Sequence, residues 1–442
     1  MSQRAWTFAD RTAAKTLHFL QVLLRDYHPR DFTVELWDGN RWEPEPDQFR
    51  RFTWRINRPD ALRTAFESDG QVALAEGYIY DDFDIEGDIE AIFPLADYLL
   101  NRKWSTQEKL RLTGMLLGLP AGRRSRTARP GMQLRGRTHS KERDRQAVGY
   151  HYNLSNDFYA LWLDRNLVYS CAYFLTADDD LDTAQVQKLD YICRKLRLHP
   201  GERLLDIGCG WGGLILHAAR EYGVHALGIT LSQPQFELAA ERIRQASLAD
   251  RCEVRLMDYR DLNESEAWDK LVSVGMVEHV GGANLPEYFR RAFGLLRPGG
   301  VFLNHGIARA GSRPAPSSPT FTDVYVFPDG ELVPLATTLR AAEEAGFETR
   351  DVENLREHYA LTLRHWLRGL ETHAEEAHRV ADEVSYRIWR LYLAGSAYYF
   401  QTGRLDVYQT LLVKNDRGRS GLPLTRTDWY VVGQSAGPRF RG

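Results

Sequence analysis

Five short apolar segments alternate with helix-length amphipathic stretches in this chain, and this alternation constrains its fold more than any other feature. The segments cover residues 203–208, 224–230, 252–259, 270–276 and 300–305. Such alternation is typical of βαβ units, in which parallel strands form a sheet that helices cover on both faces. The sequence therefore predicts an α/β fold with a parallel sheet.

The length of the chain predicts more than one domain. Its 442 residues are enough for roughly two or three units of ordinary size. We expect a smaller N-terminal accessory domain over residues 1–120, a linker over residues 121–146 and a catalytic domain over residues 147–442. The strand and helix alternation belongs to the last of these.

Local patterns predict several further elements. An amphipathic helix is expected over residues 13–24, followed by a hairpin that turns at Asp38-Gly39. Residues 309–319 are rich in Pro, Gly and Ser, which predicts a loop. Two long helices are expected over residues 358–379 and 382–402.

Composition and charge exclude several classes of protein. The 57 basic and 60 acidic residues give a net charge of −3, so we expect no nucleic-acid partner. Four cysteines without a CxxC pair predict neither a disulfide framework nor a zinc site. The sequence shows no signal-peptide pattern and no apolar stretch long enough for a membrane span. We therefore expect a cytoplasmic protein without a transmembrane segment.

An acidic cluster over residues 81–88 raises the question of a metal site. It contains five carboxylates, but their spacing differs from that of a calcium-binding EF-hand loop. Acidic residues are also common in the first turn of a helix, where they stabilise the helix dipole. We interpret the cluster as a solvated helix start, and we expect no bound metal.

A basic stretch over residues 123–145 has two interpretations. It carries nine arginines and lysines against Glu142 and Asp144. Pro130, Gly131 and Gly136 disfavour a helix, so the stretch is typical of a solvated linker. Alternatively it contacts an anionic membrane, where each basic residue contributes up to about 1 kcal/mol. Both interpretations stay open at this point.

A glycine-rich turn follows the first predicted strand in the sequence LLDIGCGWGG. Gly208, Gly210 and Gly213 fit the GxGxxG pattern of dinucleotide-binding proteins. The same turn, read from Asp206 to Gly212, fits the DxGxGxG pattern for S-adenosylmethionine. Glycines in either case permit the tight turn and let a ligand approach the backbone. The spacing alone leaves both cofactors possible.

The ends of the next two strands favour S-adenosylmethionine. A dinucleotide site usually has an acidic residue after the second strand, where it binds the ribose. Here that strand ends in residues 228–233 with the sequence GITLSQ, which has none. Residues 257–259, Met-Asp-Tyr, close the third strand and place a carboxylate there.

Several longer motifs occur in a specific order. They are HYNLSNDFY at 151–159, YSCAYF at 169–174, GITLS at 228–232, GMVEHVG at 275–281, YVFPDG at 325–330 and HYALTLRHW at 358–366. Together, over roughly residues 147–415, they closely resemble the cyclopropane-fatty-acyl-phospholipid synthase family, which includes the mycolic acid cyclopropane synthases. The resemblance implies a Rossmann-like class I methyltransferase domain with a mostly parallel seven-stranded sheet and a smaller N-terminal accessory domain.

The resemblance also implies a reaction. Members of the family transfer a methylene group from S-adenosylmethionine to the cis double bond of an unsaturated acyl chain in a membrane phospholipid. The reaction passes through a carbocation, and a bound bicarbonate ion removes the proton. The enzyme would work peripherally at the inner face of the membrane, and a homodimer is one assembly that we keep open.

The motifs carry the family's site residues over to this chain. The bicarbonate cradle is expected at Cys171, largely through its backbone, and at Glu278, His305 and Tyr359. Cofactor contacts are expected at Tyr169, Ser170, Asp206, Gly208, Gly210, Thr230, Leu231, Gln235, Asp258 and Tyr259. Taken alone, Cys171, His305 and Tyr359 also have an ordinary interpretation as part of the packed core. Glu278 follows the fourth predicted strand, where such folds place ligand-contacting residues, and this position favours a functional role.

Departures from the family pattern keep other products open. Val277 stands where the family often has Phe, and Ser396 where a cysteine is frequent. A methylene-branched or methyl-branched acyl chain is therefore an alternative product, and a small-molecule methyltransferase is a weaker one. A non-catalytic lipid-binding protein is disfavoured because Glu278 and the glycine turn are present. Five aromatic residues of the last helix either line an acyl tunnel or pack in the core: Tyr386, Trp389, Tyr392, Tyr399 and Phe400.

Overall fold

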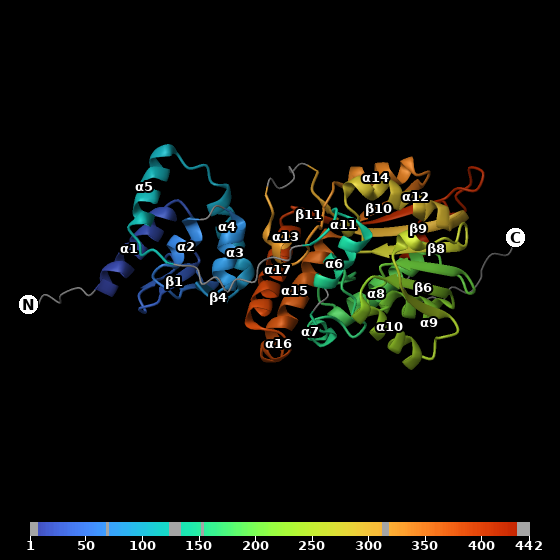
Figure 1. Ribbon diagram of the computed structural model, residues 1–442, viewed down its shortest axis with the longest axis horizontal. Coiled ribbons are helices and arrows are strands. Elements are labelled where there is room, and N and C mark those ends of the chain that lie inside the picture. The colour runs from blue at the N-terminus through green and yellow to red at the C-terminus, as the bar shows by residue number, and fades with distance from the viewer. Residues whose placement is uncertain (1–7, 68–69, 123–133, 152–153, 312–317, 431–442) are drawn as a thin grey trace, which may run out of the picture. The chain divides into compact units, whose positions relative to one another are not determined.

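The chain divides into two compact units. The computed structural model describes residues 8–67, 70–122, 134–151, 154–311 and 318–430 (Figure 1). The first unit comprises residues 1–133, 316–326 and 377–398, and the second comprises residues 134–315, 327–376 and 399–442. Two segments that we assigned from sequence to the catalytic domain, 316–326 and 377–398, thus pack with the N-terminal residues.

A seven-stranded sheet forms the centre of the second unit, in the order β10-β11-β9-β8-β5-β6-β7. Its strands are β5 (Arg203–Ile207), β6 (His225–Thr230), β7 (Cys252–Leu256), β8 (Trp268–Val274), β9 (Leu296–Arg309), β10 (Glu348–Asn354) and β11 (Leu405–Val413). All five strands expected from the apolar segments are present and pair in parallel. Strand β11 runs antiparallel to both of its neighbours, β10 and β9. The prediction of a mostly parallel seven-stranded sheet is confirmed.

Helices cover both faces of this sheet, as Figure 1 shows. One face carries α8 (Leu181–Leu196), α9 (Gly213–Tyr222) and α10 (Gln233–Gln245), and the other carries α12 (Leu285–Leu295) and α14 (Leu335–Glu344). Successive residues of β5 point to opposite faces: Leu204 joins the core under α8 and α9, and Leu205 joins the core under α12. A strand buried on both faces explains the continuous apolar sequence of this segment.

Further helices and turns complete the second unit. They are α6 (Lys141–His151), α7 (Asn156–Ala160), α11 (Val277–Val280) and α15 (Arg356–Thr372), together with the single turns η2 (Tyr259–Asp261), η3 (Gly282–Asn284) and η4 (Thr427–Trp429). Helix α16 (Ala374–Val380) follows α15. Of the basic stretch, residues 123–133 lie outside the described residues, and the part from Lys141 onward is helical rather than extended.

The first unit contains a small sheet with the order β2-β1-β3-β4. The elements of this unit are α1 (Phe8–Leu23), β1 (Phe32–Leu36), β2 (Arg41–Trp42), β3 (Phe52–Ile56), α2 (Ala61–Glu67), α3 (Gln71–Ile79), β4 (Phe83–Gly87), η1 (Ile89–Ala91), α4 (Ile92–Asn101), α5 (Thr106–Leu117) and α13 (Phe321–Tyr325). Most of α17 (Glu383–Gln401) also belongs to it, and the last three residues of this helix belong to the second unit. The predicted hairpin is confirmed, since β1 and β2 pair antiparallel with Val34 opposite Trp42. Gly39 closes the turn with φ 84°.

The acidic cluster over residues 81–88 does not form the helix start that we expected. Phe83–Gly87 is strand β4, and a single 3-10 turn (Ile89–Ala91) leads from it into helix α4, so most of the cluster lies in or before the strand. Its carboxylates pair with arginines instead: Asp82 with Arg58 at 2.7 Å, and Asp84 with Arg387 of α17 at 3.3 Å. The cluster is a set of ion pairs within the first unit.

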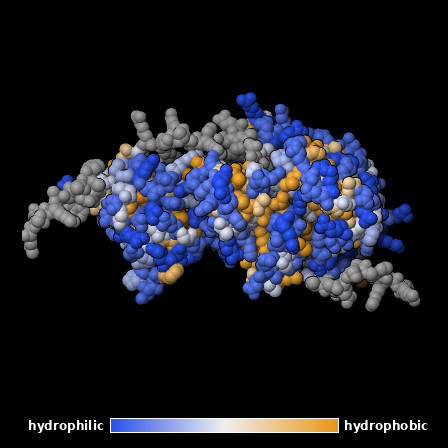
Figure 2. All heavy atoms as spheres, turned by 90° about the horizontal axis from the view of Figure 1, so that it is seen from below, coloured by the Kyte–Doolittle hydropathy of each residue, from blue (hydrophilic) through white to orange (hydrophobic). Residues whose placement is uncertain are grey.

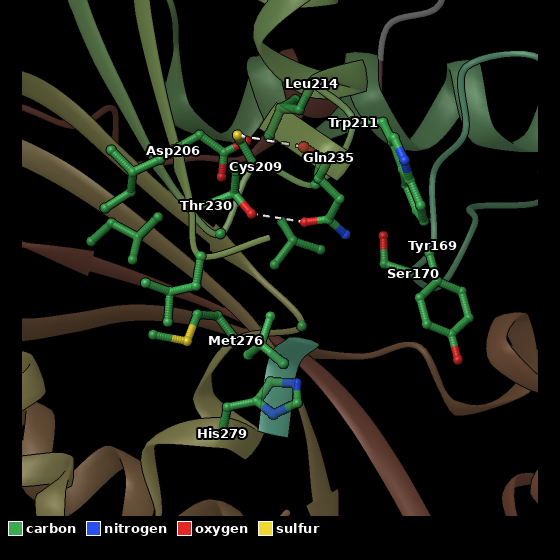
Figure 3. Close-up of a pocket in the computed structure, with 18 of the residues that line it drawn as sticks. Tyr169, Ser170, Asp206, Cys209, Trp211, Leu214, Thr230, Gln235, Met276 and His279 are labelled. Carbon is green, nitrogen blue, oxygen red and sulfur yellow. Dashed lines mark hydrogen bonds between the residues drawn. The ribbon is translucent and has the colours of Figure 1, made fainter. Parts of the chain in front are cut away.

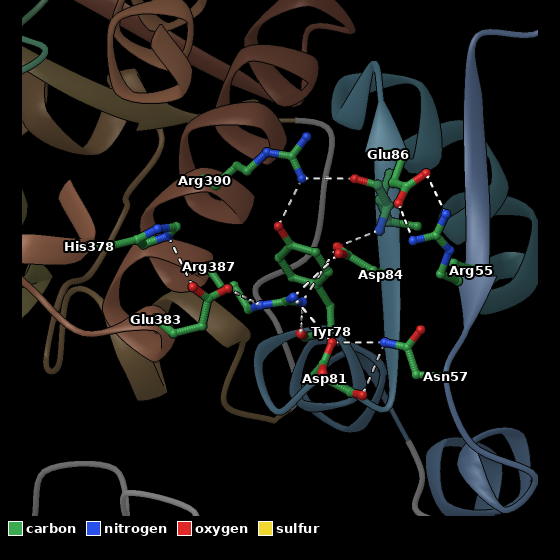
Figure 4. Close-up of polar contacts among 11 residues, drawn as sticks. Arg55, Asn57, Tyr78, Asp81, Asp84, Glu86, His378, Glu383, Arg387 and Arg390 are labelled. Atoms are coloured by element: carbon green, nitrogen blue, oxygen red, sulfur yellow. Dashed lines mark hydrogen bonds and ion pairs between the residues drawn. The ribbon is translucent and has the colours of Figure 1, made fainter. Parts of the chain in front are cut away.

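Two arginines attach α17 to this strand region (Figure 4). Arg390 donates to the hydroxyl of Tyr78 at 2.9 Å and to the carbonyl oxygen of Ile85 at 3.0 Å. Arg387 donates to the carbonyl oxygen of Tyr78 at 2.9 Å and pairs with Asp81 and Asp84. These contacts explain why a late segment of the chain belongs to the N-terminal unit.

The surface in Figure 2 is largely hydrophilic, with hydrophobic side chains in limited patches. Within the part of the chain that the structure describes, no helix combines the length and the apolar character that crossing a membrane requires.

Candidate active site

A cavity lies at the carboxyl ends of strands β5, β6 and β8 (Figure 3). In open α/β sheets this is the edge at which ligands bind. The structure brings all ten predicted cofactor residues together along its wall: Tyr169, Ser170, Asp206, Gly208, Gly210, Thr230, Leu231, Gln235, Asp258 and Tyr259.

The glycine turn shapes one side of this cavity. Gly208, Gly210 and Gly212 have φ values of 90°, 55° and 81°, which disfavour any residue with a side chain. A Cβ atom on Gly210, which lines the cavity, would have no heavy atom within 4 Å, so the space next to this residue is open. Helix α9 starts at Gly213, and Gly213 and Leu214 of its first turn line the cavity. The start of a helix offers unpaired backbone N–H groups to a ligand.

Polar side chains at the end of β6 are held in place by one another. The hydroxyl of Thr230 donates to Gln235 Oε1 at 2.8 Å, and the backbone N–H of Ser232 donates to Thr230 Oγ1 at 3.1 Å. Gln235 has its amide group directed into the cavity (Figure 3). Trp211 of the glycine turn donates from its indole N–H to Asn156 Oδ1 at 2.8 Å, which ties the HYNLSNDFY motif to the turn.

Sequence reasoning missed an arginine that organises the end of β7. Arg260 donates to the Asp258 carboxylate at 2.6 Å and to Asp144 of α6 at 2.9 Å. Asp144 and Arg260 both line the cavity beside Asp258. The sequence gives only the charges of these residues as a hint of the contact. Asp144 and the segment 258–261 are far apart along the chain, so their pairing could not be predicted.

Asp206 contributes a buried carboxylate to the cavity. Its Oδ1 atom is buried and has no hydrogen-bond partner among the described residues. Burial raises the pKa of Asp206 to about 7. Such a carboxylate is stabilised when a ligand brings a hydrogen-bond donor or a positive charge to it.

Glu278 lies in the first turn of α11, directly after β8. The backbone N–H of Ile307 donates to its Oε1 atom at 2.6 Å, while Oε2 is buried without a partner among the described residues. Burial raises the pKa of Glu278 to about 7, which the hydrogen bond from Ile307 opposes. Near neutral pH the group is therefore divided between its acid and carboxylate forms.

His305 lies on β9 next to the end of β8, where it is paired with Val274. Its Nδ1 atom is 3.3 Å from the side-chain nitrogen of Gln409, and its Nε2 atom is buried without a partner among the described residues. Burial and the nearby Lys188 keep the pKa of His305 well below its usual value, so the ring is neutral. Glu278 and His305 thus share the edge formed by two adjacent strands.

Cys171 and Tyr359 meet at the carbonyl oxygen of Leu355. The thiol of Cys171 donates to this oxygen at 3.7 Å, and the backbone N–H of Tyr359 donates to it at 3.0 Å. The backbone N–H of Leu355 donates to Val407 of β11, and Val407 lies opposite Ile307, the partner of Glu278. Backbone contacts through the β9 and β11 pair thus link the segments that carry the four predicted cradle residues, but none of the four is among the described residues that line the cofactor cavity.

The five aromatic residues of the last helix, which either line an acyl tunnel or pack in the core, are divided between the two units. Trp389 and Tyr392 are buried and belong to the first unit, where their rings pack edge to face at 5.7 Å. Phe400 belongs to the second unit, and its ring lies 4.6 Å from that of Tyr359. For Trp389 and Tyr392 this arrangement is core packing.

Comparison with known proteins decides the family. Residues 139–410 match the family model described as mycolic acid cyclopropane synthetase. The chain belongs to this family. A probable fatty acid methyltransferase of Pseudomonas putida is 41% identical over 401 residues, which cover 90% of this chain and 95% of that protein. The cyclopropane-fatty-acyl-phospholipid synthase of Escherichia coli K12 is 38% identical over 265 residues, which cover 59% of this chain and 66% of the relative.

Solved structures of the family have the same fold. The cyclopropane synthase MmaA2 of Mycobacterium tuberculosis is 33% identical with a TM-score of 0.58, over 61% of this chain and 97% of that one. The mycolic acid cyclopropane synthase CmaA1, in complex with SAH and CTAB, is 34% identical with a TM-score of 0.57, over 61% and 97% of the two chains. This member of the mycolic acid cyclopropane synthetase family is thus an S-adenosylmethionine-dependent methyltransferase.

Proposed function

We propose that this enzyme transfers the methyl carbon of S-adenosylmethionine to the cis double bond of an unsaturated acyl chain in a membrane phospholipid, and that the product is a cyclopropane ring. One observation carries the proposal beyond methyl transfer in general. Two buried polar atoms, Glu278 Oε2 and His305 Nε2, have no hydrogen-bond partner among the described residues and belong to the ends of two adjacent strands, of which β8 borders the cofactor cavity. Ring closure needs a proton acceptor that is shielded from water, and this pair can hold one.

The chemistry of these two groups fits a bicarbonate ion. With the Gln409 amide donating to Nδ1, the proton of the neutral His305 ring resides on Nε2, which can then donate to an anion. Glu278, with its pKa raised to about 7 by burial, supplies a second donor in its acid form. A small oxyanion can accept a hydrogen bond from each of these two groups.

The reaction requires two bonds to form at the transferred carbon. The alkene attacks the sulfonium methyl group, the carbon–sulfur bond breaks, and a carbocation remains on the acyl chain. A proton then leaves the transferred methyl group, and its electron pair closes the ring. Bicarbonate, when bound, supplies the proton acceptor for this second step.

Residues of this chain orient the two groups that would hold the proton acceptor, and they keep a competing nucleophile unreactive. The 2.6 Å hydrogen bond from Ile307 fixes the Glu278 carboxyl group, and Gln409 orients the His305 ring. Burial raises the pKa of the Cys171 thiol well above its ordinary value. Cys171 therefore stays protonated and does not compete with the alkene for the sulfonium methyl group.

A methyl-branched or methylene-branched product is the second candidate. Two relatives that match 90% and 80% of this chain are named probable fatty acid methyltransferases, and a third, which matches 81% of it, is named tuberculostearic acid methyltransferase. A hydride shift would move the positive charge to the carbon that bears the new methyl group. Loss of a proton from that methyl group would leave a methylene branch instead of a ring.

We also propose that the enzyme works while bound peripherally to the membrane surface. The support is the run of arginines and lysines over residues 123–145, whose first part lies outside the described residues. Basic residues next to a site for lipids bind anionic head groups in a salt-dependent manner.

The test is the chemical structure of the product. The enzyme is expressed in cells that contain unsaturated phospholipids and lack a cyclopropane synthase of their own, and the fatty acid methyl esters are analysed. Acyl chains should gain one CH₂ unit and should resist hydrogenation under conditions that reduce alkenes and spare rings. Reduction of the new product would favour the methylene branch, and no gain of CH₂ would refute both candidates.

A further inference from the structure

A buried lysine that has no place in the mechanism above lies on the wall of the cofactor cavity. Lys188 of α8 is 1% exposed and lines the cavity beside Ser170 and Asp206. Its ammonium group donates to Ser170 Oγ at 2.9 Å. Within the described residues, no carboxylate comes within 4.0 Å of it. Burying an ammonium without a paired carboxylate is costly, so a second role for the group has to be considered.

The acidic groups near Lys188 do not form an ion pair with it in the described part of the chain. Burial lowers its pKa to about 8, while Asp164, Cys171 and Asp206 act in the opposite direction. Asp164 is already satisfied, because the backbone N–H groups of Asn166 and Val168 both donate to it at 2.8 Å. Lys188 is therefore charged at neutral pH and has N–H donors to spare.

The hydrogen bond to Ser170 also fixes the direction of the serine hydroxyl. An ammonium group can only donate, so Ser170 Oγ is the acceptor and its own hydrogen points elsewhere. In the described part of the chain no acceptor is found for this hydrogen. Figure 3 shows the Ser170 side chain at the cavity wall, so the hydroxyl can donate to a ligand.

The cavity therefore offers donors and an acceptor to one ligand. Lys188 and Ser170 provide donors and a positive charge, and Asp206 provides an unpartnered carboxylate oxygen. An α-amino acid zwitterion has the complementary groups, a carboxylate and an ammonium. The methionyl end of S-adenosylmethionine is such a zwitterion.

We propose that Lys188 recognises the α-carboxylate of the methionyl end of S-adenosylmethionine, together with the Ser170 hydroxyl that it orients. The α-ammonium group of the cofactor then faces Asp206. This inference rests on the assignment of the cavity to S-adenosylmethionine. Beyond that assignment, it means that binding of S-adenosylmethionine depends on a charged residue of α8, in addition to the glycine turn and the strand ends.

The experiment compares three ligands by calorimetry. S-adenosylhomocysteine has both groups of the zwitterion, decarboxylated S-adenosylhomocysteine has only the ammonium, and 5′-methylthioadenosine has neither. Lys188→Met should bind S-adenosylhomocysteine about 10- to 100-fold more weakly than wild type, the effect of losing a hydrogen bond to a charged group. It should bind the other two ligands as wild type does.

Lys195→Met is the matched control. Lys195 lies two turns further along α8, is also 1% exposed, and is paired with Glu353 away from the cavity. Its replacement removes an equally buried lysine and should leave all three affinities unchanged. If Lys188→Met fails to fold, Ser170→Ala takes its place, with a several-fold loss expected for S-adenosylhomocysteine alone.

The outcomes separate this inference from the proposed function. Equal weakening of all three ligands by Lys188→Met would show a structural role and overturn the inference. An unchanged affinity for S-adenosylhomocysteine would overturn it as well. If wild type binds none of the three ligands, the cavity assignment fails, and the role of Lys188 falls with it.

Discussion

The backbone N–H of Ile307 donates a 2.6 Å hydrogen bond to one oxygen of Glu278, and the other oxygen is buried without a partner in the described part of the chain. Glu278 follows β8 and Ile307 belongs to the neighbouring strand β9, so the bond joins the ends of two strands. It holds a carboxyl group in place while leaving half of its hydrogen-bonding capacity for a ligand.

This burial predicts a dependence of stability on pH. The pKa of Glu278 is raised to about 7 from the ordinary 4.5, so its contribution to stability is complete below pH 4.5 and is lost as the pH rises through 7. Glu278→Gln does not titrate there. Its free energy of unfolding relative to wild type should increase between pH 5 and pH 8, by an amount on the order of 3 kcal/mol. Urea denaturation at four pH values measures it, and parallel profiles would contradict the assignment.

The glycine turn predicts a loss of cofactor affinity without loss of the fold. Gly210→Val places a branched side chain in the open space at the cavity wall. Gly201→Val is the control, because Gly201 also has positive φ (85°) and free space around it but lies outside the cavity. Both variants carry backbone strain of about 1–2 kcal/mol. Calorimetry with S-adenosylhomocysteine should detect a large loss only for Gly210→Val, and equal affinities would refute the role of the turn.

Cys171 is predicted to be inert as a nucleophile. Since burial raises the pKa of its thiol, the native enzyme should react with iodoacetamide at this position far more slowly than the unfolded chain does. Cys171→Ala should keep its affinity for S-adenosylhomocysteine, and its turnover should stay within several-fold of wild type, because the expected contribution is from the backbone. Rapid native alkylation, read by peptide mass spectrometry, would show a reactive thiolate instead.

Arg390 is predicted to stabilise the first unit. Arg390→Met leaves the carbonyl oxygen of Ile85 and the hydroxyl of Tyr78 without this donor, at a cost of about 1–3 kcal/mol for each unsatisfied buried group. Arg55→Met removes an arginine with more exposed ion pairs and should cost less than about 1 kcal/mol. Hydrogen exchange of the β4 amides measures the difference. Equal protection in the two variants would contradict a stabilising role for Arg390.

The basic stretch is predicted to promote membrane binding. Replacing Arg123, Arg124, Arg126 and Arg129 with Gln should weaken binding to anionic vesicles, and the difference from wild type should shrink as salt is added. Four exposed arginines of the second unit serve as the control set: Arg244, Arg251, Arg417 and Arg419. Equal vesicle binding by wild type and both variants at low salt would leave only the linker interpretation.

The sheet and its cavity could be predicted because their signals are local. A strand buried on both faces, such as β5, must be apolar throughout, and the ends of parallel strands gather polar residues at one edge. Strand β10 could not be located in this way. Its residues are only partly buried, and its sequence ETRDVEN has no apolar run.

The features that could not be predicted from the sequence depend on contacts between residues far apart along the chain. Lys188 has the same appearance in the sequence as any lysine of an amphipathic helix, and only the packing of α8 shows that it is buried. The segment 377–398 joins the first unit through Arg387 and Arg390, whose partners lie about 300 positions away. The acidic cluster and these arginines have opposite charges, which is compatible with ion pairs. Which residues pair with which can be seen only in the folded structure.

The dependence of turnover on bicarbonate tests the central claim most directly. Methyl transfer to vesicles of unsaturated phospholipid is measured in carbonate-depleted buffer and again after bicarbonate is added, for wild type and for Glu278→Gln. We expect depletion to slow the wild type and added bicarbonate to restore it, while Glu278→Gln binds S-adenosylhomocysteine normally and stays slow in both buffers. Full wild-type turnover without carbonate, together with wild-type activity of Glu278→Gln, would contradict the assignment of Glu278 and His305 as the cradle of the proton acceptor.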